Sequence, residues 1–178
     1  MSIEDQTAYV DCLYFVVCGT MKNSEIINLS SRENAMNIEA RVHLVQDMQF
    51  SGTAATSGHR LTMDADDTAG GHNAGFRPME LLLVAFGGCS GMDVISILRK
   101  KRQAVVDLEI NVRGEKAEDY PKIYKQIHIE YVVKGKNIEK QAVERAISLS
   151  LDKYCSVGAT LSKAGTITHD FRIEETGE

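Results

Sequence analysis

The stretch LLLVAFGGCSGMDVISIL, residues 81–98, is strongly apolar and has a cysteine, Cys89, at its centre. Eighteen residues is close to the length that crosses a lipid bilayer. However, Asp93 lies inside the stretch, and a carboxylate near the bilayer centre costs about 2.5–3.5 kcal/mol. Its three glycines add no apolar area. The stretch therefore predicts the buried helix of a globular domain rather than a membrane span.

Composition limits the classes of protein that the chain can belong to. A length of 178 residues suits one domain with a real hydrophobic core. A net charge of −5 argues against a nucleic-acid partner, because such binders are usually basic. The chain opens MSIEDQ, with acids where a secretory signal carries lysines. We therefore expect a cytoplasmic protein with neither a nucleic-acid nor a membrane partner.

Two parts of the chain differ in pattern. Residues 1–35 combine a short apolar patch with a polar stretch, which predicts an N-terminal extension that is accessory or disordered. Cys12 and Cys18 lie in this part, and we expect them to be structural or incidental. Residues 36–178 are cleanly patterned and are predicted to form the folded domain.

The patterned part predicts an α+β fold. Apolar residues alternate with polar ones where strands are expected, and they recur at helical spacing elsewhere. The predicted order is a strand meander from residue 37, a glycine-rich loop, a helix over 78–102, a strand hairpin, a helix over 138–154 and a final strand from 166. Alternating strand–helix–strand units are absent from this order, so we expect antiparallel sheets.

Cys89 and Cys155 occupy different predicted settings. Asp93 lies four residues after Cys89 and so beside it on a helix, where an ionised carboxylate disfavours a thiolate. A reactive Cys89 then needs a compensating cation. Cys155 lies where a short helix begins, and free backbone N–H groups there favour a thiolate. Taken alone, each cysteine is more typical of a buried core residue, and none of the cysteines has zinc-site spacing. We expect Asp93 to have a hydrogen-bond donor, with a partner subunit as one source.

From Met36 to its end, the chain resembles the OsmC/Ohr superfamily, which includes the organic hydroperoxide resistance proteins. The resemblance rests on RPMELLLVAFGGCSGMDV around Cys89 and on KYCSVGATLSK around Cys155. It implies an intertwined homodimer, with antiparallel sheets around long buried central helices. It also implies that Cys89 is the peroxidatic cysteine and Cys155 the resolving one, and that an external dithiol resets the pair without a metal, haem or flavin cofactor.

The sequence departs from the family pattern at two supporting positions. The family has a glutamate directly after the proline that opens the helix, but here Met79 holds that place and Glu80 follows it. On a helix Glu80 begins on the face opposite Cys89, so a catalytic role for it needs an interface with the partner chain. Our register places Gln49 where the family has an arginine, which leaves Arg41, Arg60 and Arg77 as alternatives.

Two functions follow from these residues. The first is thiol-dependent reduction of organic hydroperoxides in defence against oxidative stress, which requires Cys89 and Cys155. The alternative is a dimeric binding protein for a small apolar or electrophilic ligand, with weak or no peroxidase activity. The cysteine pair favours the first function, and the departures at Glu80 and Gln49 favour the second.

Overall fold

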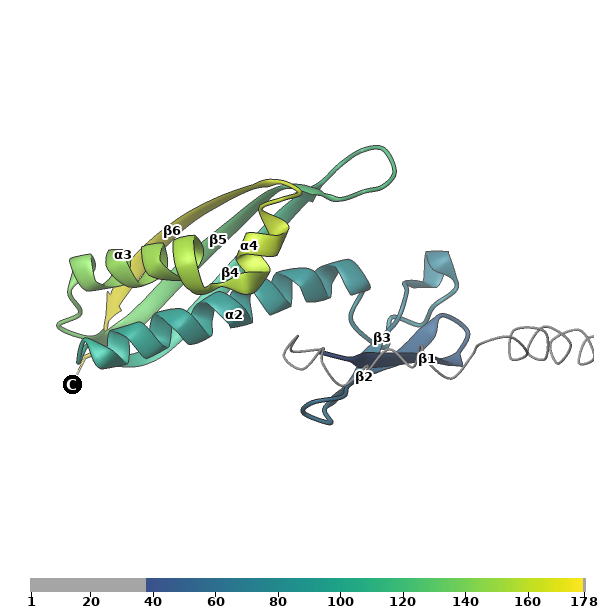
Figure 1. Ribbon diagram of the computed structural model, residues 1–178, viewed down its shortest axis with the longest axis horizontal. Coiled ribbons are helices and arrows are strands. Elements are labelled where there is room, and N and C mark those ends of the chain that lie inside the picture. The colour runs from purple at the N-terminus through teal and green to yellow at the C-terminus, as the bar shows by residue number, and fades with distance from the viewer. Residues whose placement is uncertain (1–37, 178) are drawn as a thin grey trace, which may run out of the picture. The chain divides into compact units, whose positions relative to one another are not determined.

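The computed structural model describes residues 38–177 (Figure 1), and Ala40–Glu178 form one compact unit. The predictions for residues 1–35, including those for Cys12 and Cys18, lie outside the described residues. The elements are β1 (Ala40–Gln46), β2 (Gln49–Ala54), β3 (Arg60–Met63), η3 (Asp67–Ala69), α2 (Pro78–Lys100), β4 (Ala104–Lys116), β5 (Tyr124–Lys136), α3 (Lys140–Leu149), η4 (Ser150–Tyr154), α4 (Ser156–Leu161) and β6 (Thr166–Glu175). This mixture of helices and two sheets confirms the α+β prediction.

The first sheet is the predicted meander of β1, β2 and β3, paired antiparallel throughout. The predicted turn between β2 and β3 contains Gly58, whose φ of 71° is left-handed and therefore suits glycine. Every residue of β1 is exposed, including Val42 and Leu44. A period of two normally marks a strand with one buried face. The apolar face of β1 therefore has no cover within the described part of this chain.

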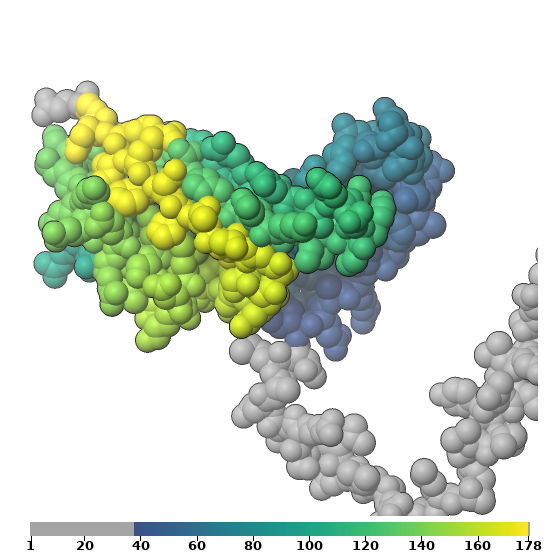
Figure 2. All heavy atoms as spheres, turned by 90° about the horizontal axis from the view of Figure 1, so that it is seen from above, coloured from purple at the N-terminus to yellow at the C-terminus, as the bar shows by residue number. Residues whose placement is uncertain are grey.

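The second sheet has the order β4-β5-β6. β4 and β5 form the predicted antiparallel hairpin, but β6 pairs parallel to β5, with Ile127 opposite Ile167. The expectation of antiparallel sheets without a strand–helix–strand unit was wrong at this place. After β5 the chain crosses over through α3, η4 and α4 and returns in the same direction, as a parallel pair requires. Figure 2 shows β6, in yellow, at the surface of the unit.

The hydrophobic core lies between this second sheet and the helices, which cover one of its faces (Figure 1). Alternate residues of β5, from Ile127 through Tyr131 to Val133, are almost completely buried. They pack against apolar side chains of α2 and α3, among them Phe86 and Ile147. The period-two pattern read from β5 therefore marks its core face correctly.

Helix α2 begins at Pro78, one residue after the N-cap Arg77, and Glu80 closes a capping box with it. By length and composition α2 is apolar enough to cross a membrane. The domain buries only 33% of its most apolar 18-residue segment. Its unburied apolar surface follows one side, which we name the open stripe; it comprises Val84, Ala85, Gly88, Met92 and Ser96. The helix therefore has a packed face and an uncovered one.

Candidate functional site

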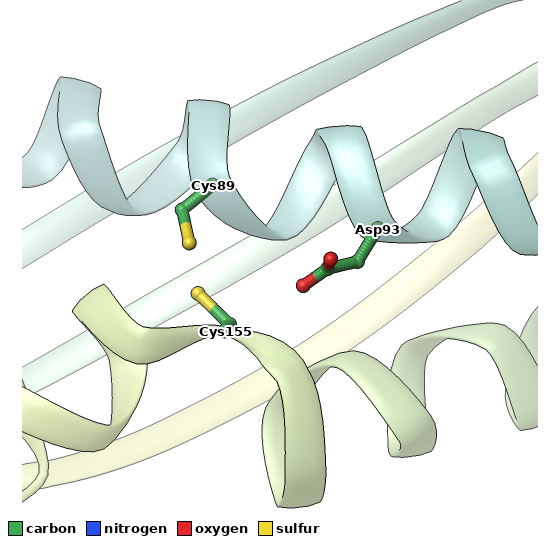
Figure 3. A group of neighbouring side chains, drawn as sticks. All are labelled: Cys89, Asp93 and Cys155. Carbon is green, nitrogen blue, oxygen red and sulfur yellow. The ribbon is translucent and has the colours of Figure 1, made fainter. Parts of the chain in front are cut away.

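Three reactive side chains from distant parts of the sequence meet beside α2 (Figure 3). Cys89 and Asp93 lie one turn apart on α2, as predicted, and Cys155 reaches toward them from the junction of η4 and α4. The two sulfur atoms and a carboxylate oxygen of Asp93 all lie within 4.8 Å of one another. Cys89 and Asp93 are half-buried, whereas Cys155 is only 2% exposed. We call these three residues the cysteine cluster.

Cys155 is the N-cap of α4, and its sulfur accepts a hydrogen bond of 3.3 Å from the Gly158 N–H. It directly follows η4, a single wide π-helical turn of a kind that is frequent at functional sites. The predicted helix N-terminus is therefore confirmed, but its effect on the thiol is outweighed. Burial, with smaller contributions from Cys89 and Asp93, raises the pKa of Cys155 to about 12. Cys155 is therefore a neutral thiol at pH 7.

A chain of hydroxyl groups holds the Asp93 carboxylate. Ser150 Oγ donates to Asp93 Oδ2 at 3.1 Å, and Ser90 Oγ lies 2.9 Å from Ser150 Oγ. Tyr131 Oη lies 2.5 Å from Ser90 Oγ. Because Ser150 gives its proton to Asp93, the bonds run in one direction, from Tyr131 through Ser90 and Ser150 to the carboxylate. The donor expected for Asp93 thus comes from the same chain, and no partner subunit is needed for it.

Sequence reasoning missed these three hydroxyl groups. Ser90 and Ser150 are completely buried, and so is Tyr131, whose pKa burial raises to about 12. A buried hydroxyl needs a partner, because an unsatisfied one costs about 1–3 kcal/mol. A serine next to Cys89 within the apolar helix was the available signal. Its partners lie 41 and 60 positions away and could not be identified from local pattern.

The glycines of α2 divide between its two faces. A Cβ atom on Gly87 would lie 3.2 Å from Val112 Cγ2, and one on Gly91 would lie 2.6 Å from Ile110 Cδ1. These two glycines therefore let α2 approach β4 closely. A Cβ on Gly88 would meet nothing within 4 Å. Two of the three glycines thus pack against the sheet, and the third faces open space.

An apolar groove of about 710 Å³ runs between α2 and β4. Its lining includes Gly88 and Met92 of the open stripe, together with Val106 and Ile110 of β4. Cys89 does not line it. The groove and the cysteine cluster therefore belong to different surfaces of the helix.

The structure places Glu80 away from the cysteine cluster. Its carboxylate accepts from the Arg77 backbone N–H at 3.1 Å and pairs with the Arg77 guanidinium at 3.5 Å. Arg77 also pairs with Asp66 at 3.7 Å. Within this chain Glu80 caps the start of α2, and its catalytic role at an interface stays a prediction.

The other positions considered for the family arginine lie in the first sheet. Arg41 and Arg60 are both opposite Thr53, on the two strands that flank β2, and Gln49 is the first residue of β2. A cation for Cys89 from any of these positions stays a prediction.

Comparison with known proteins connects this fold to a family. Residues 71–170 match the model of the OsmC-like protein family. Protein YhfA of Escherichia coli K12 is 43% identical over 139 residues, which is 76% of this chain and 98% of YhfA. A hypothetical protein from Aquifex aeolicus is 35% identical, and its crystal structure superposes with a TM-score of 0.69 over 79% of this chain and 98% of its own.

A more distant structure shares the fold. It is an organic hydroperoxide resistance protein, OsmC, from Legionella pneumophila, with 9% identity and a TM-score of 0.60 over 78% of this chain and 98% of its own. The family match spans the cysteine cluster, β4, β5 and the first part of β6, and the alignment with YhfA extends over nearly all of that protein. The chain therefore belongs to the family of OsmC-like proteins.

Proposed function

We propose that this protein is a thiol-dependent reductase of organic hydroperoxides that acts as a homodimer in the cytoplasm and serves in defence against oxidative stress. The observation that carries the proposal is the convergence of Cys89 and Cys155, whose sulfur atoms face each other beside α2 (Figure 3). Distant structural relatives named as organic hydroperoxide resistance proteins support the same chemistry.

The two cysteines differ in a way that assigns their roles. Cys155 is 2% exposed and carries a neutral thiol, because burial raises its pKa to about 12. Cys89 is more accessible. The Cys89 thiolate attacks the distal oxygen of the hydroperoxide, and the O–O bond breaks. The sulfur loses two electrons and becomes a sulfenic acid, while the alkoxide takes a proton and leaves as an alcohol.

The second step consumes the buried thiol. The Cys155 sulfur attacks the sulfenic sulfur of Cys89, an S–S bond forms, and the hydroxyl group leaves with the thiol proton as water. Asp93 lies within 4.8 Å of both sulfurs and is the group placed to carry that proton. An external dithiol then reduces the disulfide by exchange, so the electrons of the reaction come from that dithiol.

Uncovered apolar surfaces support the homodimer. Met92 on the open stripe of α2 and Val106 on the edge strand β4 are each 74% exposed, and the whole of β1 is exposed as well. Contiguous apolar surface of this kind marks an interaction site. A second copy presents the same surface, as a two-fold interface requires, and Gly88 leaves room for its backbone.

The proposal is tested by peptide mass spectrometry after one equivalent of an organic hydroperoxide under anaerobic conditions. A Cys12→Ser/Cys18→Ser background removes the two other thiols. We expect a Cys89–Cys155 disulfide in this background. With Cys155→Ser added, we expect sulfenic acid trapped on Cys89. Cys89→Ser abolishes turnover. Reduced thiols together with surviving hydroperoxide would contradict the proposal.

A second candidate function is binding of a small apolar or electrophilic ligand. The groove between α2 and β4 favours it, because about 710 Å³ of apolar-lined space suits a small molecule and Cys89 does not line it. Cys89→Ser discriminates between the two functions. It abolishes hydroperoxide turnover under the first and leaves ligand binding nearly unchanged under the second.

A further inference from the structure

The cysteine cluster has the composition of a site for a soft divalent cation. It brings together two thiols and one carboxylate, and its sulfur and oxygen atoms converge on a common space (Figure 3). Thiolates select ions such as Zn²⁺ among the divalent metals, and a carboxylate completes many zinc sites. Three protein ligands leave the fourth tetrahedral position to water, as in exchangeable zinc sites.

The spacing of these atoms suits a metal-bridged arrangement. In tetrahedral zinc, bonds of about 2.0–2.3 Å hold the ligand atoms roughly 3.5–3.8 Å apart. The ligand atoms here all lie within 4.8 Å of one another, so no separation exceeds the tetrahedral value by more than about 1.3 Å, which side-chain rotations can supply. A disulfide requires the sulfurs to approach to about 2.05 Å.

Supporting hydrogen bonds already orient two of the three ligands. Metal-binding carboxylates are typically held by an outer hydrogen bond, and Ser150 Oγ supplies one to Asp93 Oδ2 at 3.1 Å. Cys155 Sγ accepts from the Gly158 N–H at 3.3 Å. Through Ser90 and Tyr131, the Ser150 bond continues into the core of the domain. The second oxygen of Asp93 is left for the ion.

We propose that Cys89, Asp93 and Cys155 bind Zn²⁺, with both thiols releasing their protons to solvent as the Zn–S bonds form, and that the bound ion protects the two sulfurs from oxidation. Metal binding uses both sulfurs, and so does the disulfide, so the ion and the disulfide exclude each other. The binding of the ion is independent of the proposed hydroperoxide chemistry. Only the protective effect rests on that proposed function.

The test is a titration of the reduced, metal-free protein with Cd²⁺, in the Cys12→Ser/Cys18→Ser background and without oxygen. Cadmium stands in for zinc because its bonds to thiolates give an ultraviolet charge-transfer band. We expect one equivalent to saturate the band and Zn²⁺ to displace it. The absence of the band would overturn the proposal.

Asp93→Asn tests the third ligand. We expect the dissociation constant for Cd²⁺ to rise at least about tenfold. Removing only a hydrogen-bond partner of a metal ligand already weakens metal affinity by about that factor. Asp152→Asn is the matched control, because Asp152 also accepts from a serine hydroxyl, that of Ser148 at 2.9 Å, but lies outside the cluster. Equal affinities of the two variants would overturn the proposal.

The Co²⁺ spectrum of the Cys12→Ser/Cys18→Ser protein is a second test. It keeps all three proposed ligands, so it does not depend on whether a ligand variant folds. Tetrahedral bands with sulfur-to-cobalt charge transfer support the site, and an octahedral spectrum overturns it. A protein that binds the metal when it is added, but leaves hydroperoxide intact while it is metal-free and reduced, supports the metal site and contradicts the proposed reductase. A protein that reduces hydroperoxide without binding the metal overturns the metal site alone.

Discussion

The two faces of α2 have opposite chemistry. On the packed face, Ser90 and Asp93 belong to a hydrogen-bonded chain that ends at the buried Tyr131. On the open stripe, Val84 and Met92 are exposed without any cover in the described part of the chain. The hydroxyl of Ser90 and the carboxylate of Asp93 are therefore satisfied on the packed side, whereas Val84 and Met92 are exposed on the other. Exposed apolar surface of this kind is typical of an interaction site, and the proposed homodimer would use it.

Either a lipid bilayer or a second copy of the chain would cover the open stripe. A second copy accounts for more of the structure, because the apolar residues of β1, such as Val42 and Leu44, are exposed in the same chain. In the proposed homodimer, the two faces of α2 would contact two different partners, the domain itself and its copy.

The largest expected effect concerns the packed face and the reactivity of Cys155. With a pKa of about 12, roughly one Cys155 thiol in 10⁴ is ionised at pH 8, against about one in ten for a free cysteine with the ordinary pKa of 9.0. Alkylation by iodoacetamide in the Cys12→Ser/Cys18→Ser background should therefore be about 1000-fold slower at Cys155 than at a free thiol. The rate should rise about tenfold per pH unit, and the measurement is peptide mass spectrometry over time.

The same pKa fixes the sign of a pH effect on stability. Unfolding returns Cys155 to its ordinary pKa of 9.0, so above that pH the unfolded chain loses a proton that the folded chain keeps. The free energy of unfolding should fall as the pH rises from about 9 toward 12. Cys155→Ser should flatten this slope. If Cys155 were alkylated at pH 8 as fast as a free thiol, its sulfur would not be buried from solvent on the packed face.

The next effect concerns the open stripe. Met92→Glu places a charge on the surface that we assign to the second copy, and an unpaired buried charge costs about 3–5 kcal/mol. The dissociation constant of the homodimer should rise at least about 100-fold, as measured by sedimentation velocity. Tyr120→Glu is the control, because Tyr120 is 87% exposed in the hairpin loop and does not line the groove. If the two variants sedimented identically, the open stripe would not be part of the dimer interface.

Local patterns in the sequence were sufficient to predict the helices and strands. They were not sufficient to predict how the strands pair. Alternation located the β4–β5 hairpin, and Pro78 located the start of α2 within a residue. The direction of β6 was missed because periodicity gives a strand and its faces but not its orientation. The burial that raises the pKa of Cys155 was missed for a related reason. It comes from groups distant in sequence, whereas the helix N-terminus that opposes it is local.

The candidate site was predictable only in part. The proximity of Asp93 to Cys89 followed from helical spacing, and the convergence of Cys89 with Cys155 was implied by the family resemblance. Local pattern could not identify Ser150 or Tyr131 as partners of Ser90, because these bonds join three separate elements. The hydrogen-bonded chain is a property of the tertiary structure, and it is the part of the site that most needs an experimental test.

The smallest expected effect is on the free energy of unfolding. It is measured with one matched pair of serine substitutions, one on each face of α2. Ser90→Ala removes the central hydroxyl of the buried chain and leaves the hydroxyls of Tyr131 and Ser150 without it, which should lower the free energy of unfolding by about 1–3 kcal/mol. Ser96→Ala makes the same chemical change on the open stripe, where the Ser96 hydroxyl has no hydrogen-bond partner among the described residues, and should shift it by about 0.5 kcal/mol or less. Urea unfolding at one fixed protein concentration measures both, because a dimer's apparent stability depends on concentration. If the two variants lost equal stability, the Ser90 hydroxyl would contribute no more to the free energy of unfolding than the Ser96 hydroxyl. Packing alone would then hold Asp93 in place.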